Sequence, residues 1–160
     1  MEQGLSFTLI ETLLRIALGL RFLYSGVSNV RRWPNPVKNA EIVFPFGSTF
    51  FGFVAVFLMV AGGVGLVLGF HTRLAALMIV LFLIPTLRIQ RHWLRTLPGM
   101  IEEVDKGLAQ EEGKRKFRLL ARHALHSHET GWKNNLLFLL LAAWFALRGS
   151  IVFGLDNWLE

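Results

Sequence analysis

Residues 50–70 read FFGFVAVFLMVAGGVGLVLGF, an apolar run without a single charged residue. A helix needs about 20 residues to cross the roughly 30 Å apolar core of a bilayer. This run is long enough to cross as one helix, and we predict a transmembrane span over about residues 49–70.

The composition of the whole chain agrees with a membrane protein. Of the 160 residues, 53% are hydrophobic and only 18% are charged, whereas about a quarter of a soluble domain is charged. The chain has no cysteine, which excludes disulfides, thiolate nucleophiles, Fe–S clusters and Cys-ligated zinc. The net charge of +6 gathers in the expected loops, so we predict no nucleic-acid partner. Residues 1–160 are expected to form one domain, without a signal peptide.

Two further apolar runs follow. One covers Leu74–Leu87 and reaches Trp93 if its Arg and His side chains snorkel to the interface. The other covers Leu136–Leu147, begins just after Lys133 and continues past Arg148. They predict spans over about residues 73–93 and 133–153.

The first segment, predicted to span about residues 6–29, is less apolar because it contains Glu11, Arg15 and Arg21. A charge at the centre of a span costs roughly 2.5–3.5 kcal/mol. The segment either lies in the membrane interface or crosses with its charges turned toward other helices. Glu11 and Arg15 are four residues apart and share a helix face, which favours crossing.

The connection from Arg88 to Lys133 is the longest, with ten basic and six acidic residues. Helical periodicity over residues 114–126 places apolar side chains on one face and Arg115, Arg118 and Arg122 on the other. This pattern is typical of an amphipathic helix on an anionic membrane surface. A helix docked on a partner subunit fits it equally well.

Basic residues are divided unequally between the two sides of these spans. The first and third loops carry thirteen Lys or Arg residues, against only Arg73 and Arg148 on the other side. Cytoplasmic loops carry the excess of such residues. We therefore expect both loops in the cytoplasm and both termini in the periplasm.

Small residues mark a packing face on the second span. Ala61, Gly65 and Gly69 recur every four residues, a spacing that lets helices approach closely in lipid. The alternative is that these glycines only add local flexibility.

Three stretches resemble the DoxX family of small prokaryotic membrane proteins. They are LLRIALGLRFLYSGVSNV (residues 13–30), GGVGLVLGFHTRLAALMIV (residues 62–80) and the tail from GWKNNLLFLL to RGSIVFGLDNWL (residues 131–159). The resemblance implies four membrane helices. It also implies a link to oxidoreductases, because the best-described relatives form the membrane part of a thiosulfate:quinone oxidoreductase. The chain departs from the family at Asn29, where members often carry Lys, and in its longer, more basic third loop.

Polar residues from three stretches are expected to meet near the outer face, where ionisable groups in a membrane are functional candidates. They could bind an oxyanion or a quinone head group. The alternative is that Glu11–Arg15 and Arg73–Asp156 are ion pairs that fix helix register. The candidate residues are Glu11, Arg15, His71, Arg73, Arg148 and Asp156.

No metal site is predicted, although three histidines of the third loop lie close in sequence: His123, His126 and His128. They lack the order of a known metal motif, and the chain has no nucleotide or triad motif either. Because no redox centre is evident in the chain, the sequence does not decide whether it is an enzyme.

The sequence as a whole predicts a four-helix membrane bundle with an interfacial amphipathic helix, in a prokaryotic inner membrane. The predicted function is a membrane subunit of a quinone-linked respiratory or sulfur-oxidising complex, with quinone as the candidate cofactor. Expected partners are the lipid bilayer and other membrane subunits, or further copies of the chain. A purely structural accessory subunit and a small transporter are the alternatives.

Overall fold

The computed structural model describes residues 2–149 and 154–156, and these residues form five helices and no strand. The predicted all-helical class is therefore confirmed. Residues 150–153, the last part of the predicted span 133–153, lie outside the described residues. The helices are α1 (Glu2–Arg31), α2 (Asn35–Glu41), α3 (Ser48–Leu68), α4 (Thr72–Gly107) and α5 (Glu111–Arg148).

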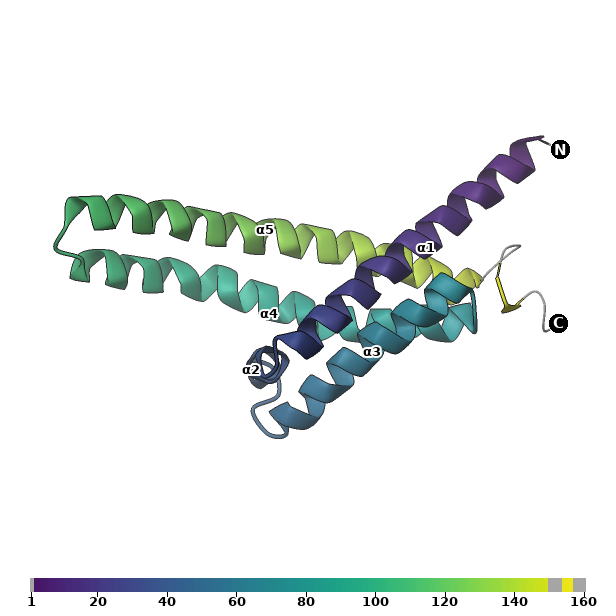
Figure 1. Ribbon diagram of the computed structural model, residues 1–160, viewed down its shortest axis with the longest axis horizontal. Helices are drawn as coiled ribbons and strands as arrows, with labels where there is room; N and C mark the ends of the chain where they lie inside the picture. The colour runs from purple at the N-terminus through teal and green to yellow at the C-terminus, as the bar shows by residue number, and fades with distance from the viewer. Residues whose placement is uncertain (1, 150–153, 157–160) are drawn as a thin grey trace.

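The helices pack as a series of neighbours (Figure 1). Helix α1 lies along α3, α3 turns back into α4, and α4 and α5 form a long hairpin, while α1 barely touches α5. The start of α1, the turn from α3 to α4 and the end of α5 all lie at one end of the molecule. At the other end the hairpin extends beyond α1 and α3. We call residues 94–127, at the tip of the hairpin, the arm.

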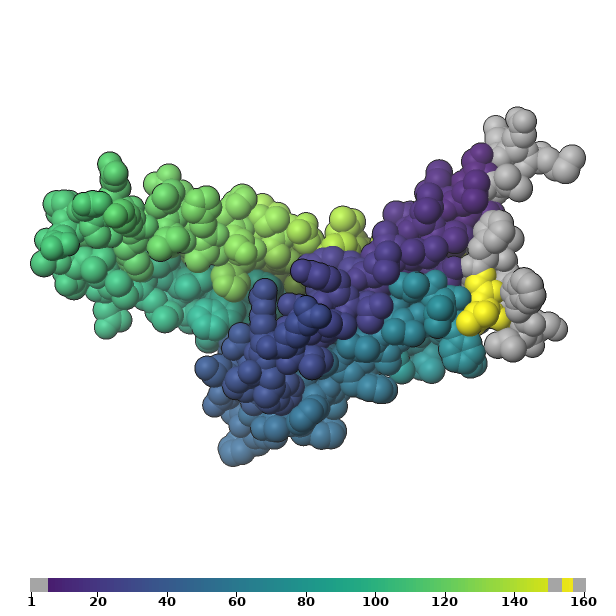
Figure 2. Space-filling view, in the orientation of Figure 1, coloured from purple at the N-terminus to yellow at the C-terminus, as the bar shows by residue number. Residues whose placement is uncertain are grey.

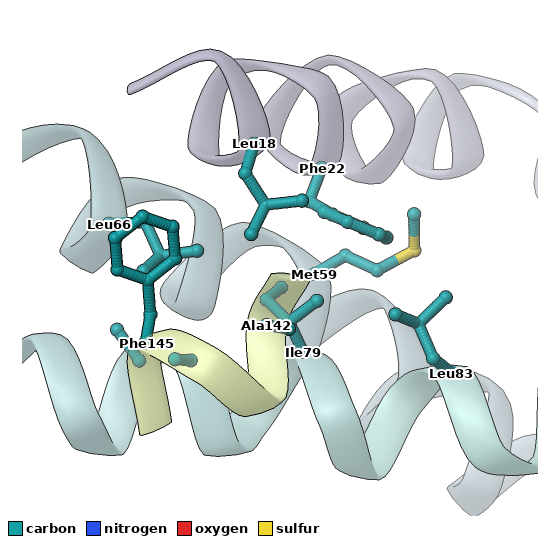
Figure 3. Packing of buried hydrophobic residues seen from close by; sticks show 10 residues of the cluster. Leu18, Phe22, Met59, Leu66, Ile79, Leu83, Ala142 and Phe145 are labelled. Atoms are coloured by element: carbon teal, nitrogen blue, oxygen red, sulfur yellow. The ribbon is translucent and has the colours of Figure 1, made fainter. Parts of the chain in front are cut away.

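One small hydrophobic core joins the four long helices (Figure 3). Leu18 and Phe22 of α1 point toward Leu66 of α3 and Ile79 of α4, and Phe145 of α5 is buried with them. The Phe22 ring also meets the rings of two neighbouring helices edge-on, at 6.0 Å and 5.8 Å between centroids: Phe82 and Phe138. Burial of these side chains holds together helices that diverge elsewhere.

Helices α1 and α3 cross in close backbone contact. A Cβ on Gly63 would lie 2.7 Å from the backbone nitrogen of Leu23 and 2.9 Å from the carbonyl oxygen of Gly19. A Cβ on Gly19 would meet Gly63 and Val67 just as closely. Only glycine fits on both sides of this crossing, an arrangement typical of helices that pack in lipid.

The outer surface of the helices is rich in apolar side chains. Helices α3 and α4 are long and apolar enough to cross a membrane, the only two in the part of the chain that the structure describes. Helices α1 and α5 fall short of that measure, yet each exposes a row of large apolar residues, such as Leu13 and Leu20 on α1 and Leu137 and Leu140 on α5. A water-soluble monomer rarely exposes so much contiguous apolar surface.

The third loop differs from the sequence prediction. Helix α4 continues past residue 93 to Gly107, through Pro85 and Pro98, and α5 begins already at Glu111. Residues 114–126 are helical, but they are the first half of α5 and pack against α4 instead of forming a separate helix. The connection of 46 residues is in fact two helix extensions joined by residues 108–110. The first loop also contains α2, which starts next to Pro34 and Pro36.

Candidate functional site

The polar residues at the end of the molecule that holds the start of α1 and the end of α5 gather around the turn from α3 to α4. Helix α3 ends in a Schellman motif: the N–H of Phe70 donates to the carbonyl of Gly65 at 2.9 Å, and Gly69 is left-handed with φ 64°. The side chain of Arg15, only 3% exposed, reaches this helix end from α1. Its Nη1 donates to the carbonyl of Leu66 at 3.1 Å. A cation is favoured at this position because the carbonyl groups at the end of a helix carry partial negative charge.

The absence of a side chain on Gly69 makes room for this contact. A Cβ there would collide with Nη1 of Arg15 and lie 2.6 Å from the Cα of Gly154. The segment at residues 154–156 is tied to the same turn, because the N–H of Leu155 donates to Leu68 at 3.2 Å and that of Asp156 to Gly69 at 2.9 Å. Three distant stretches of chain therefore meet at one glycine.

Asp156 caps helix α4 from outside it. Its carboxylate accepts hydrogen bonds from the backbone N–H groups of His71 (2.5 Å) and Thr72 (2.9 Å), the first residues of the helix. These N–H groups have no partner within the helix, and a negative charge is favoured at this end. His71 adopts a left-handed conformation, with φ 43°, at the point where the chain reverses.

The remaining charges of this region come from α1, α4 and α5. Glu11, whose side chain is 12% exposed, lies 3.7 Å from Nε of Arg148, and that guanidinium also stacks on Trp144 at 5.2 Å. Arg73 donates to the backbone carbonyl of Arg148 at 3.5 Å. One carboxylate oxygen of Glu11 is buried without a hydrogen-bond partner in the described part of the chain.

The structure thus brings together all six predicted site residues, which we call the terminal cluster: Glu11, Arg15, His71, Arg73, Arg148 and Asp156. Arg15 is attracted electrostatically to Asp156 and to Glu11, but the closest contacts of the two carboxylates differ from the ion pairs considered from the sequence. Glu11 faces Arg148, and Asp156 binds backbone N–H groups of the α4 start. The four-residue spacing favoured an ion pair between Glu11 and Arg15, because spacing along the sequence indicates only contacts within one helix.

The predicted packing residues of α3 have three different surroundings. Gly65 faces α4, where an added Cβ would lie 2.6 Å from that of Ala75. Gly69 ends the helix, and Ala61 is half-buried. Two glycines outside the predicted set make equally close contacts: Gly62 toward α4 and Gly63 toward α1.

A groove of about 580 Å³ lies between α2–α3 and the middle of α4, at the opposite end of the bundle. We call it the lateral groove. Most of its walls are apolar, with Phe44 and Phe51 on one side and Phe82 and Pro85 on the other. Its polar lining is confined to a few side chains: Asn29, Asn39, Thr86, Gln90 and His128. An apolar cleft with few polar groups is typical of small-molecule sites.

The polar end of the groove is ordered by contacts between α4 and α5. Nδ1 of His128 lies 2.8 Å from Oε1 of Gln90, within hydrogen-bond distance. The imidazole also stacks on Trp93, with 5.9 Å between ring centroids and 22° between planes. Burial lowers the pKa of His128 and favours the neutral imidazole. A neutral His128 can donate to Gln90 and keep its second nitrogen as an acceptor.

A second hollow of about 330 Å³ lies where α1 and α5 diverge, and it shares Asn29, Phe82 and Thr86 with the groove. Its lining is more polar and includes Arg21, Ser25 and Asn135. The sequence prediction of binding residues missed both hollows, since their walls come from helices far apart in the chain. Asn29, at the polar end of the first predicted span, was the one available signal.

The predicted surface residues lie on the arm. Arg118 donates two hydrogen bonds to Asp105 across the hairpin, at 2.9 Å and 2.7 Å, whereas Arg115 and Arg122 point to solvent. The loop histidines do not converge, and no three potential metal-ligating side chains cluster in the described residues.

These features together define a small helical membrane protein: two helices can cross a bilayer, the bundle exposes rows of large apolar side chains, and the buried guanidinium of Arg15 binds a helix end. The model of one family, DoxX, matches residues 10–92, and the chain belongs to this family. The match covers α1, α2, α3 and the first part of α4, so the resemblance in the tail lies outside it. No curated protein and no solved structure matches the chain significantly.

Proposed function

We propose that the protein is a membrane subunit of a quinone-linked oxidoreductase complex, of a respiratory or sulfur-oxidising kind, and that the lateral groove holds the quinone. The groove is the observation that carries this proposal. Its volume of about 580 Å³ lies within the usual range for small-molecule sites, and its apolar walls suit a ring with an isoprenoid tail. A bound quinone would supply the acceptor for two electrons and two protons.

The residues of the groove fit the polar part of a quinone. Its carbonyl oxygens need hydrogen-bond donors, and the amides of Asn29 and Asn39 lie in the groove wall. His128 and Gln90 close the polar end as a pre-oriented pair, which could accept or release a proton at the quinone oxygen. The sequence offers no redox centre, so we assign electron delivery to a partner subunit.

The terminal cluster has a structural role in this proposal. Arg15 donates a hydrogen bond to the end of α3, and Asp156 accepts two from the start of α4. Binding of an oxyanion or of the quinone at this cluster is the second candidate, favoured by the three arginines gathered there. A Glu11→Gln, Arg15→Met double variant separates the two. If the cluster is structural, the assembled double variant should keep full quinone-linked turnover. If the cluster binds a ligand, that turnover should be lost in the double variant and also in Arg15→Lys, because an ammonium cannot reproduce the planar set of guanidinium donors.

For the membrane arrangement we propose four spans and periplasmic termini. The exposed apolar rows on α1 and α5 support crossing by these helices. Thirteen basic residues gather at the end with α2 and the arm, which favours a cytoplasmic location for that end. A reporter inserted at Gly113 should read as cytoplasmic and one fused after Glu160 as periplasmic, and the opposite labelling would reject the orientation.

Groove-filling variants test the quinone site. Ala55 lines the groove, and Ala55→Phe should lower the quinone that co-purifies in mild detergent by at least tenfold. Ala17 lies on an exposed surface of α1, so Ala17→Phe is the matched control and should retain quinone. A wild-type protein that co-migrates with a redox enzyme but carries no quinone would instead support the purely structural accessory subunit.

A further inference from the structure

The arm carries an exposed apolar surface on α5, well away from the rest of the bundle. Leu119 is 55% and Leu120 68% exposed, although the span predicted for this helix begins only at residue 133. In the space-filling view the arm (green) extends away from α1, α2 and α3 (Figure 2). Neighbouring apolar side chains of this size outside a membrane mark an interaction surface.

Uncompensated positive charge borders Leu119, the first of these two leucines. Arg115 and Arg122 lie four residues before and three after Leu119, so both are its neighbours on the helix surface. Neither forms an ion pair within the described residues. The other basic residues of α5's first turns are paired: Lys114 with Glu111, Lys116 with Glu112, and Arg118 with Asp105. We call Arg115, Leu119, Leu120 and Arg122 the arm patch.

Arg115, the outer end of the arm patch, lies too far from a bilayer to bind lipid head groups. Helix α5 is continuous from Glu111 to Arg148. At 1.5 Å per residue, Arg122 is about 16 Å and Arg115 about 27 Å along the helix from residue 133. Tilting the helix by 40°, the upper end of the usual range, still leaves Arg115 about 21 Å above that level. Attraction to anionic lipid fades within a Debye length of about 8 Å.

A second copy of the chain is a poor occupant as well. In a two-fold dimer the same patch meets itself, which would bring Arg115 and Arg122 of one copy against those of the other. The arm has little free negative charge to offset this repulsion. Of its five acidic residues, four are engaged in ion pairs within the arm: Glu102, Asp105, Glu111 and Glu112.

We infer that the arm patch binds a soluble protein through an amphipathic helix whose apolar stripe is bordered by Asp or Glu. Such a helix would cover Leu119 and Leu120 and pair its carboxylates with Arg115 and Arg122. This inference deepens the proposed function by naming the chemistry of the partner's surface, and it rests on that proposal for placing the arm outside the membrane.

Crosslinking in intact cells tests the arm patch on the full chain. The photoreactive residue p-benzoylphenylalanine, placed at position 119, should give one dominant adduct with a soluble protein, mapped to an acidic amphipathic helix of that protein. The partner is then purified and its binding measured on nanodisc-embedded protein. The variants Arg115→Glu with Arg122→Glu, and Leu119→Ser with Leu120→Ser, should each weaken binding at least tenfold at low salt. The matched control exchanges the charges of the Glu102–Lys106 pair and should bind normally.

Adducts with lipid or with a second copy would overturn the inference, as would the absence of any adduct. A soluble partner whose binding tolerates both arginine reversals would overturn it too. Circular dichroism of each variant checks that the arm stays helical. The quinone content of the same preparations is an independent measurement, so loss of quinone with intact docking would reject only the groove proposal.

Discussion

The two ends of the α4–α5 hairpin hold their charges in different ways. At the end near the termini, Arg15 is 3% exposed and bonded to a backbone carbonyl of another helix. On the arm, the side chain of Arg118 is 60% exposed and pairs with Asp105 at the surface. The first kind of contact joins separate helices and cannot be lost without leaving buried groups unpaired. The second competes with water and contributes little to stability.

The largest expected effect comes from the crossing of α1 and α3. Gly63→Ala places a Cβ against backbone atoms of Leu23 and Gly19 that have no room to move. Overpacking of this kind lowers the free energy of unfolding by about 1–3 kcal/mol. We expect a value near the top of this range, because the new Cβ meets backbone atoms instead of a flexible side chain. Thermal unfolding in detergent measures the loss.

Gly99→Ala on the arm is the matched control, since nothing lies within 4 Å of a Cβ there. Alanine should stabilise that position by about 0.5–1 kcal/mol, because glycine is a poor helix former. Equal melting temperatures for the two variants would show that α1 and α3 do not pack closely in the membrane.

Removing the buried guanidinium should have the next largest effect. Arg15→Met deletes the hydrogen bond to Leu66, and a bond made by a charged group contributes about 1.5–3 kcal/mol. Arg118→Met should leave the unfolding midpoint in detergent unchanged, because its bond with Asp105 is exposed. If Arg118→Met lowered the unfolding midpoint more than Arg15→Met, the exposed pair on the arm would contribute more to stability than the buried contact.

The cap on α4 should contribute less. Asp156→Ala removes the acceptor for the N–H groups of His71 and Thr72, and loss of an N-terminal cap costs about 0.5–2 kcal/mol. Asp156→Asn keeps an acceptor and should restore most of that loss. Hydrogen exchange at Thr72 and the next few residues reports the fraying directly, and unchanged protection in Asp156→Ala would exclude capping.

The smallest effect concerns the pH dependence of the arm. The hydrogen bonds and charge of Arg118 hold the pKa of Asp105 below its usual value. A carboxyl group with a lowered folded-state pKa adds stability above its unfolded-state pKa, and that stability is lost as the pH falls through the folded-state pKa. Spin labels at Val104 and Leu120 should therefore show broader distances between α4 and α5 only under acidic conditions, below the ordinary pKa of Asp.

An Asp105→Asn variant should show that broadening already at neutral pH and no further change on acidification. If the wild type and Asp105→Asn behave alike at every pH, the ion pair across the hairpin has no part in arm order.

Periodicity and composition were sufficient to predict α3 and the helical class of the chain. The uncharged run at residues 50–70 predicted α3 to within two residues at its end, because Gly69 stops the helix by a local mechanism that its neighbours cannot alter. The resemblance in residues 13–30 and 62–80 likewise identified the family that the match over residues 10–92 shows. Signals of this kind lie in continuous stretches of sequence and can be read along the chain.

The sequence did not predict which residues of different helices contact one another. Glu11 lies next to Arg148, which is 137 residues away, and the lateral groove takes its walls from all five helices. The charged residues beyond the apolar run also led the prediction to end this span near residue 93, whereas α4 continues to Gly107 and packs against α5.

The sequence by itself determined where this chain is apolar, where α3 ends and which residues carry charge. Tertiary structure alone decided that Arg15 caps α3, that Asp156 caps α4 and that residues 94–127 stand free as an arm. The physical reason is that burial and hydrogen bonding depend on which surfaces meet, and surfaces distant in sequence meet only after the helices have packed.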